Sequence, residues 1–407
     1  MSGGVDSSVT AALLKEQGFS VHGVHIKMWS DPSIPCNFKE DRYDAMAVAA
    51  HLDIPYDTWD LTKEYKKEVV EYMIREYVAG RTPNPDVMCN RHIKFGIFLS
   101  KALELGADFI ATGHYVRTVP SAYRLENTLS FSSEKLRSVI GRSLASRDRA
   151  GRPLNGFLSD TPRSREIKLL KGVDKNKDQS YFLWTLTQEQ LKHCLFPIGE
   201  YTKPQVRELA KKFGLPTAEK AESQGICFIG EINLREFLKN YIPVKRGPVL
   251  TTSGKKVGEH DGLAFYTIGQ REGLGTGGGG VPYYVAEKDF TRNALIAAEG
   301  PYDEKLFRKE LSVTDINWIS GKEQHPPLQC MARIRYRQPL QSCRIERILA
   351  KSIRVRFSEP QRAVTPGQSV VFYQGEPFNH AQDREMLGGG IIRMRPRVIL
   401  PDLKIVY

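Results

Sequence analysis

The 407-residue chain has no run of about 18 apolar residues, the minimum for a membrane-spanning helix. It also shows no secretory signal, because a polar glycine–serine stretch stands at its start. We therefore expect a cytoplasmic protein without a membrane partner. A mitochondrial location is the alternative if a transit peptide was lost upstream of Met1.

The sequence has no Cys-x-x-Cys pair, which argues against a zinc ribbon and against a disulfide framework. Its six cysteines are scattered along the chain: Cys36, Cys89, Cys194, Cys227, Cys330 and Cys343. In a reducing compartment, isolated cysteines either fill a core or carry chemistry.

Acidic residues are outnumbered, with 47 Asp and Glu against 59 Lys and Arg, which gives a formal charge of +12. This excess fits a polyanionic partner, although a merely soluble basic surface gives the same number. The hydrophobic content of 41% is that of an ordinary globular protein, and the length predicts two or three domains.

A Walker phosphate loop is also absent, because no Gly-Lys-Ser/Thr follows the first glycines. What stands there instead is Ser-Gly-Gly-Val-Asp-Ser-Ser at residues 2–8, followed at once by an apolar-periodic helix. Gly3 and Gly4 let the backbone turn tightly round an oxyanion, and the helix N-terminus offers free N–H groups. This pattern predicts the pyrophosphate loop of enzymes that split ATP between its α and β phosphates. A glycine turn with a Ser/Asp helix cap is the alternative.

Such a loop ordinarily follows a buried strand, and only Met1 precedes it here. We leave open whether the start site lies further upstream or the sheet lacks its usual first strand.

The next hundred residues alternate between strand and helix patterns. Strands are predicted at 19–29, 54–60 and 107–112, and helices at 41–52 and 64–77. This alternation predicts a doubly wound parallel sheet, in which ligands bind at the carboxyl ends of strands. Ser2–Ser8, Lys27–Trp29 and Thr112–Tyr115 all fall at such ends.

Residues 80–95 contain a second polar motif. Pro83 and Pro85 fix an extended turn, and a helix that starts near Asp86 puts Asp86 and Cys89 on one side, one turn apart. Basic neighbours and the helix N-terminus would lower the pKa of the Cys89 thiol. A thiolate beside a proton-carrying carboxylate makes a nucleophile pair. An inert cysteine and a helix-capping Asp is the alternative.

The rest of the chain divides by composition. Residues 119–168 are rich in Ser and Arg and predict a mobile insertion, and helices are predicted at 187–195 and 204–213. Turn-forming residues then predict a small β-rich module, and strands dominate from 308 onward. We expect domains at 1–230, 231–305 and 306–407.

Two strands of the last domain alternate apolar residues with arginine, at 331–337 and 352–357. Because alternate residues of a strand point to opposite faces, one face is predicted to pack and the other to present arginine. The prediction is an antiparallel barrel or sandwich whose basic face suits phosphate contacts, or a solvated outer face.

Taken together, these stretches resemble the tRNA-specific 2-thiouridylase (MnmA/TrmU) family over nearly the whole chain. The matching pieces are SGGVDSS at 2–8, KMW at 27–29, RTPNPDVMCN at 81–90, IKFG at 93–96, TGHY at 112–115, KDQSYFL at 177–183, ESQGICFIG at 222–230, YTIGQR at 266–271 and RIRYRQ at 333–338. SGGVDSS fits many ATP pyrophosphatases, whereas RTPNPDVMCN together with ESQGICFIG is far more selective.

The resemblance implies an α/β ATP-pyrophosphatase domain, a small β-rich central domain and a C-terminal β-barrel. It implies 2-thiolation of the wobble uridine of tRNA, through adenylation of the uridine C2 oxygen and sulfur transfer from a cysteine persulfide. The chain would thus be a tRNA-uridine 2-sulfurtransferase that uses ATP, with Mg²⁺ implied by the phosphate chemistry. Its partners would be a tRNA and a persulfide donor, either a cysteine desulfurase or a sulfur-relay protein.

The resemblance also assigns roles to residues of this sequence. Cys227 matches the persulfide carrier, Cys89 the second catalytic cysteine and Asp86 the acid/base residue, and a Cys89–Cys227 disulfide would remain after turnover. The ATP-binding positions would be Ser2, Gly3, Gly4, Val5, Asp6, Ser7, Met28 and Gly113. The substrate-binding positions would be Asn84, Pro85 and Asp86 for the target base, and His114, Lys177, Asp178, Gln179, Arg335, Tyr336 and Gln368 for tRNA.

Two other readings of the sequence stay open. An ATP pyrophosphatase that acts on a small molecule would need the loop but not two distant cysteines or an arginine-faced β domain. A tRNA-binding relative with impaired catalysis fits the short start of the chain.

Overall fold

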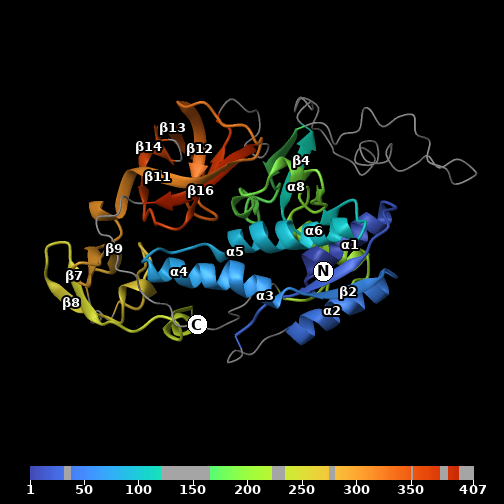
Figure 1. Ribbon diagram of the computed structural model, residues 1–407, viewed down its shortest axis with the longest axis horizontal. Coiled ribbons are helices and arrows are strands. Elements are labelled where there is room, and N and C mark those ends of the chain that lie inside the picture. Colours follow the sequence, from blue (N-terminus) through green and yellow to red (C-terminus); the bar gives the residue numbers. More distant parts are fainter. Residues whose placement is uncertain are drawn as a thin grey trace, which may run out of the picture.

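The computed structural model describes residues 1–31, 38–120, 166–221, 234–274, 280–349, 352–375 and 384–393. Cys36, Cys227 and most of the predicted insertion lie outside these residues. Figure 1 shows an α/β part, a small β part beside it and a barrel that lies above both.

The N-terminal part alternates helices and strands as the sequence predicts. Its elements are α1 (Val5–Glu16), β1 (Gly23–Lys27), α2 (Phe38–His51), β2 (Tyr56–Asp60), α3 (Thr62–Tyr65), the π-helix η1 (Lys66–Glu71), α4 (Tyr72–Val78), α5 (Pro85–Met88), the π-helix η2 (Cys89–Phe98), α6 (Leu99–Glu104), β3 (Ile110–Ala111), β4 (Val116–Pro120), β5 (Ile167–Lys171), the 3₁₀ turn η6 (Ser180–Phe182), α8 (Gln188–Leu191), β6 (Cys194–Leu195) and α9 (Lys203–Lys212).

The structure describes two separate two-stranded parallel sheets in this part. β1 pairs with β2, and β3 pairs with β6. Helix α1 packs its apolar side, including Val9 and Leu13, against α9, because those residues recur at helical spacing. The parallel α/β class that the sequence predicts is confirmed.

The middle part is a four-stranded sheet with the order β8-β7-β10-β9, in which β7 and β10 run parallel and the outer pairs antiparallel. Its elements are α10 (Leu234–Lys239), β7 (Gly247–Thr251), β8 (Lys256–His260), the 3₁₀ turn η7 (Leu263–Phe265), β9 (Tyr283–Asp289), β10 (Ala294–Glu299) and the 3₁₀ turn η8 (Glu304–Leu306).

The C-terminal part is an antiparallel barrel of six strands, closed by the pairing of β11 with β16. Its strands are β11 (Phe307–Trp318), β12 (Leu328–Arg333), β13 (Gln341–Leu349), β14 (Ser352–Arg362), β15 (Ser369–Tyr373) and β16 (Glu385–Arg393). Ile353, Val355 and Phe357 of β14 are buried, which confirms the predicted alternation of that strand. Closure gives each of the six barrel strands a partner on both sides.

One hairpin joins the α/β part to the barrel. β4 pairs with β5, and β5 pairs in turn with β16, so both strands extend the barrel sheet. The predicted bounds of the insertion, 119–168, are therefore too wide at both ends, because Val119, Pro120, Ile167 and Lys168 are strand residues. Residues 121–165 lie outside the described part.

Two further element predictions were wrong. The helix expected at 187–195 ends at Leu191, and Cys194–Leu195 is a strand, because it pairs with β3 and long-range pairing overrides local pattern. The strand expected at 331–337 ends at Arg333, and Arg337 has a positive φ of 66° in the turn that follows. Within the described residues, no helix is long and apolar enough to cross a membrane.

The largest apolar core runs through all three parts. It contains Met73 and Val87 of the central helices, Leu263 and Val285 of the middle sheet and Ile391 of the barrel. In Figure 1 the helices α3 to α6 cross the centre of the molecule, and the end of α4 and the start of α5 lie beside both β parts.

Candidate active site

The glycine–serine loop turns into helix α1 as the sequence predicts. Gly3 has a positive φ of 75°, and a Cβ there would meet the backbone oxygen of Asp41 at 2.2 Å, so only glycine fits. Ser7 and Ser8 donate their hydroxyl groups to the carbonyl oxygen of Gly4, at 3.1 and 2.9 Å. The loop thus leads directly to the N–H groups of a helix start, which is the geometry that binds an oxyanion.

Asp6, in the first turn of α1, is held by two groups from distant segments. Tyr115 donates its hydroxyl to Asp6 Oδ1 at 2.7 Å, and the ammonium of Lys203 lies 2.7 Å from the same oxygen. The sequence carried no sign of Lys203, because 197 positions separate it from Asp6. Lys203 adds a cation beside the loop, where the charge of a phosphate would be balanced.

Gly113 brings the end of β3 against this loop. A Cβ at Gly113 would lie 3.0 Å from the backbone nitrogen of Ser7, so the two backbones approach as closely as glycine allows. Met28 follows the carboxyl end of β1. Gly113 and Met28 therefore lie just past strand ends, where this class of sheet binds its ligands. The expectation that the loop itself follows a strand is wrong for the described residues, since α1 is the first element, but Gly113 brings this edge of the sheet against the loop.

His114 is buried next to Gly113. Its Nδ1 lies 2.8 Å from the hydroxyl of Thr112, and its ring packs 5.7 Å from the ring of Phe95, measured between centroids. Burial, with the charge of Lys94 in addition, holds the pKa of His114 well below its ordinary value. The imidazole is therefore neutral at pH 7.

The polar motif at 80–95 opens a long helix, as predicted. Asn84 caps the helix by accepting from the Val87 N–H at 3.3 Å, and Pro85 takes the first helical position. Asp86 follows one residue later. No donor in the described part of the chain hydrogen-bonds to its carboxylate, and burial raises the pKa of Asp86 although Lys94 opposes the shift. Such a carboxyl group is suited to carry a proton.

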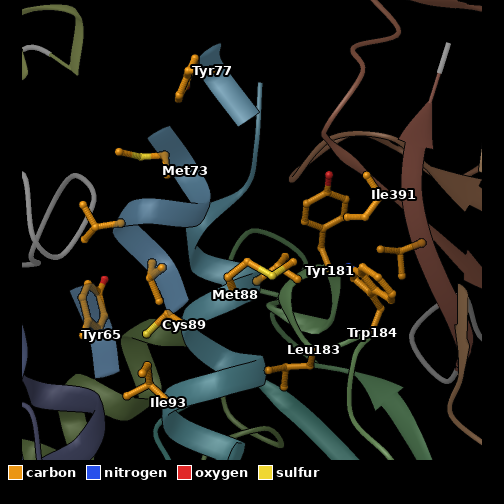
Figure 2. Packing of buried hydrophobic residues seen from close by; sticks show 14 of the residues in the cluster. Tyr65, Met73, Tyr77, Met88, Cys89, Ile93, Tyr181, Leu183, Trp184 and Ile391 are labelled. Carbon is orange, nitrogen blue, oxygen red and sulfur yellow. The ribbon is translucent and has the colours of Figure 1, made fainter. Parts of the chain in front are cut away.

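Cys89 lies one turn after Asp86, at the point where the helix changes to π geometry. Its side chain is 4% exposed and belongs to the large apolar core. Figure 2 shows Cys89 beside Tyr65 and Ile93, with Met88 directed toward the Tyr181 side. The lowered thiol pKa expected for Cys89 stays a prediction. Cys227, its expected partner, lies outside the described residues.

Residues 177–183 connect the helix to the barrel. Asn90 donates its amide to the carbonyl of Phe182 at 3.2 Å, and Gln179 accepts from the Tyr115 N–H at 3.0 Å. Asp178 is 2% exposed and receives Arg333 at 2.6 Å. These side chains hold protein segments together in this structure, and their contact with tRNA stays a prediction, as does that of Lys177.

Arg333 corrects the expectation of an arginine-faced strand. Its side chain donates to Asp178, Ser180 and Tyr373 in the interior. Burial lowers the pKa of Arg333, but its interactions with Tyr373 and with the Asp178 carboxylate outweigh burial and raise it. Arg333 therefore cannot form part of a phosphate-binding surface. Arg356 does point outward, and lies 2.5 Å from Glu310.

The three barrel positions expected at tRNA are placed differently from one another. Arg335 donates to Thr365 at 2.6 Å and to the carbonyl of Ile268 at 3.2 Å. The ring of Tyr336 packs against that of Phe182 at a tilt of 47°, with ring centroids 4.6 Å apart. Gln368 donates its amide to the carbonyls that precede Asn84.

A metal cage is not formed by the residues that the structure describes: they contain no group of three or more His, Cys, Asp or Glu able to hold an ion. Asp6 is the one carboxylate within the loop, and its Oδ1 is engaged by Tyr115 and Lys203. This donor set suits Mg²⁺ only in the form that Mg²⁺ adopts with nucleotides, bound by phosphate oxygens and water.

Three protein families and several named relatives match this chain in sequence. The family described as "tRNA methyl transferase HUP domain" matches residues 1–138 and 157–231, "tRNA methyl transferase PRC-barrel domain" matches 235–299, and "Aminomethyltransferase beta-barrel domain" matches 308–392. The tRNA-specific 2-thiouridylase MnmA of Bacillus cereus is 44% identical over 394 residues, which is 96% of this chain and 93% of that protein. This chain belongs to the tRNA-specific 2-thiouridylase family.

A second relative gives the same result. MnmA of Streptococcus thermophilus is 44% identical over 398 residues, again 96% of this chain and 93% of that protein. Among solved structures, a predicted subunit of a tRNA methyltransferase from Methanocaldococcus jannaschii covers 34% of this chain and 60% of its own at 18% identity, with a TM-score of 0.20 that carries no argument. The three matched families correspond to an α/β HUP domain, a β-rich middle domain and a barrel, which confirms the fold class. The exact domain boundaries stay predictions.

Proposed function

We propose that this protein is an ATP-dependent tRNA-uridine 2-sulfurtransferase that converts the wobble uridine of tRNA to 2-thiouridine. The observation that carries the proposal is the 44% identity to 2-thiouridylases along 96% of the chain. The site supports it, because a pyrophosphate loop and the Asp86–Cys89 helix turn lie in one α/β domain. The loop would serve activation by ATP, and the Asp86–Cys89 turn would serve the nucleophilic chemistry on the base.

The first step activates the uridine. The C2 oxygen attacks the α-phosphorus of ATP, and pyrophosphate leaves, so that a poor leaving group becomes AMP. In this step Ser2, Gly3, Gly4, Val5, Asp6, Ser7, Met28 and Gly113 hold the nucleotide. The N–H groups at the start of α1 and the ammonium of Lys203 offset the charge that leaves with pyrophosphate. Mg²⁺, where bound, would neutralise phosphate oxygens.

The second step transfers sulfur. The terminal sulfur of a persulfide on Cys227 attacks C2 of the adenylated uridine, and AMP departs. The Cys89 thiolate attacks the Cys227 sulfur, which breaks the S–S bond of the persulfide and leaves the terminal sulfur on the base. A Cys89–Cys227 disulfide remains, and a dithiol reductant must open it before the next turnover. A persulfide donor protein then reloads Cys227.

Asp86 moves the proton in this scheme. Its carboxyl group has a raised pKa and no hydrogen-bond partner in the described chain, so both of its protonation states are within reach. Asn84 and Pro85 hold the target base next to it, after the uridine has left its stack. The remaining tRNA contacts are assigned to His114, Lys177, Asp178, Gln179, Arg335, Tyr336 and Gln368.

The decisive experiment compares Cys227→Ser with Cys194→Ser. Cys194 is a buried cysteine whose pKa burial raises, so it serves as a matched control. We expect Cys227→Ser to abolish 2-thiouridine formation while leaving tRNA affinity unchanged, because the persulfide needs sulfur and the interface does not. Nucleoside mass spectrometry of a wobble-uridine tRNA measures the product.

Other products of the same assay would contradict the proposal. Normal 2-thiouridine formation by Cys227→Ser would remove Cys227 from its role. A methylated nucleoside would favour the transfer chemistry named in two of the family descriptions. Pyrophosphate release that does not depend on tRNA would favour a small-molecule substrate.

A further inference from the structure

The chain between α4 and α5, residues 80–83, is the point where all three parts of the molecule meet. It follows the last turn of α4 and leads directly into Asn84, Pro85 and Asp86. Gly80 and Arg81 are bonded back to the end of α4, and the other hydrogen bonds that hold the segment come from the barrel on one side and from the middle part on the other.

The barrel side is held by Gln368 and its neighbours. The Gln368 amide donates to the carbonyl oxygens of Thr82 at 2.9 Å and of Pro83 at 3.0 Å, which uses both of its N–H groups. The Thr82 N–H donates to the carbonyl of Pro366 at 2.9 Å. At Gly367 a Cβ would lie 2.8 Å from the Thr82 carbonyl oxygen, so this close approach requires glycine.

The middle sheet holds the other end. Lys288 of β9 donates its ammonium to the carbonyl oxygen of Gly80 at 3.1 Å, and the ring of Phe290 fills the space where a Gly80 side chain would stand. The hydroxyl groups of Thr82 and Thr267 lie 3.2 Å apart.

Lys288 is an unusual use of a cation. Gly80 follows the C-cap of α4 with a positive φ of 75°, so its carbonyl lies just beyond the negative end of the helix dipole. The Lys288 side chain is partly buried, and burial lowers its pKa to about 7. In the described chain this lysine has no carboxylate partner, and its one acceptor is the Gly80 backbone.

We propose that Lys288 and Gln368 are positioning residues that clamp residues 80–83 and so fix where α5 presents Asp86 and Cys89. This inference rests on the proposed function, because it assigns the clamp to the same reaction. It also gives Gln368 a role inside the protein, separate from any contact with tRNA. Both residues act from outside the α/β part, so docking of the β parts sets the geometry of the catalytic helix.

The test uses Lys288→Met and Gln368→Met, which keep most of the side-chain length and remove the donors. Each has a matched control. Lys256→Met removes an exposed lysine of β8, at the opposite edge of the same sheet, that pairs with Glu259. Gln341→Met removes an amide at the start of β13 that donates only to the nearby carbonyl of Pro339 in the described chain. Hydrogen–deuterium exchange of peptides covering residues 80–90 is measured on the full chain, together with single-turnover thiolation and tRNA affinity.

We expect exchange of the Arg81 and Thr82 amides to rise about fivefold to tenfold in both clamp variants, the range that loss of one or two hydrogen bonds produces. Exchange in strands β10 and β15 stays unchanged, which separates the local effect from unfolding. The maximal rate of thiolation falls by a similar factor in both clamp variants, and tRNA affinity stays unchanged in Lys288→Met. The control variants behave as wild type.

Unchanged exchange at residues 80–90 in both clamp variants would overturn the inference, whatever the activity. For Gln368→Met, weaker tRNA binding with normal exchange would also overturn it and would favour a direct tRNA contact. A wild-type protein that forms no 2-thiouridine would refute the proposed function and leave the exchange measurement to decide the clamp.

Discussion

Asp86 and Asp178 are two carboxylates withdrawn from water in opposite circumstances. Asp178 accepts from Arg333 at 2.6 Å and from the N–H groups of Gly172 and Ser180, both at 3.2 Å. Asp86 accepts no hydrogen bond from the described residues, and burial raises its pKa. A satisfied carboxylate holds segments together, whereas an unsatisfied one keeps a proton available. The contrast separates chemistry from architecture in motifs that look alike in sequence.

The largest effect is expected when the unsatisfied carboxylate is changed. Asp86→Asn keeps the size of the side chain and its place in the first helical turn, but it cannot carry a proton. We expect single-turnover thiolation to fall by about 10²–10⁴, the range for lost general acid/base catalysis. ATP affinity, which depends on the separate loop at Ser2–Ser8, stays within about twofold.

Two outcomes would break this assignment. A rate loss below about threefold would remove Asp86 from the proton-transfer role. A loss of ATP affinity equal to the loss of rate would show that the substitution had damaged the fold.

Changing the satisfied carboxylate should instead cost stability. Asp178→Asn leaves the Arg333 guanidinium buried without its charge partner, which typically destabilises a protein by about 3–5 kcal/mol. Chemical denaturation measures the free energy of unfolding. Glu310→Gln, which breaks the exposed pair with Arg356, is the control and should cost less than about 1 kcal/mol. Equal losses in the two variants would mean that burial of the Arg333 pair contributes nothing.

The pH dependence of the rate sharpens the same comparison. If Asp86 must be ionised to accept a proton, thiolation falls as the pH drops through its pKa. Because burial raises that pKa, the acid limb of the profile lies above the ordinary value of about 3.8. Asp86→Asn should remove the limb, measured by single-turnover rates, while Asp178→Asn should retain it. A limb that persists in Asp86→Asn belongs to another group.

The smallest effect is expected in the salt dependence of tRNA affinity, when arginines of the barrel are changed. Arg333 is buried, whereas Arg354 and Arg356 alternate outward on β14. If the outward face meets tRNA phosphates, Arg354→Ala and Arg356→Ala each make the log–log slope of affinity against salt shallower by about 1. Arg333→Met should leave the slope unchanged, as measured by titration in a salt series. Identical slopes in all variants would make the face solvated surface.

Several features of the fold follow from residues that are close in sequence. Gly3 and Gly4 predicted the turn into α1, Asn84 and Pro85 predicted the start of α5, and the alternation at 352–357 predicted β14. The predictions hold because caps, turns and strand alternation are set by neighbouring residues. Local chemistry also placed Asp86 and Cys89 one turn apart. Their roles remain predictions, and Cys227 lies outside the described residues.

Other features were decided only by tertiary structure. The alternation at 331–337 predicts that Arg333 points outward with the other arginines. The strand ends at Arg333 instead, and its side chain is buried because it pairs with Asp178, 155 positions earlier in the sequence. The same holds for Lys203 beside Asp6, for the β4–β5 hairpin on the barrel and for Lys288 on Gly80. Local periodicity gives the direction of a side chain within its own element. It does not give the element that arrives opposite, and desolvation and charge pairing depend on that partner.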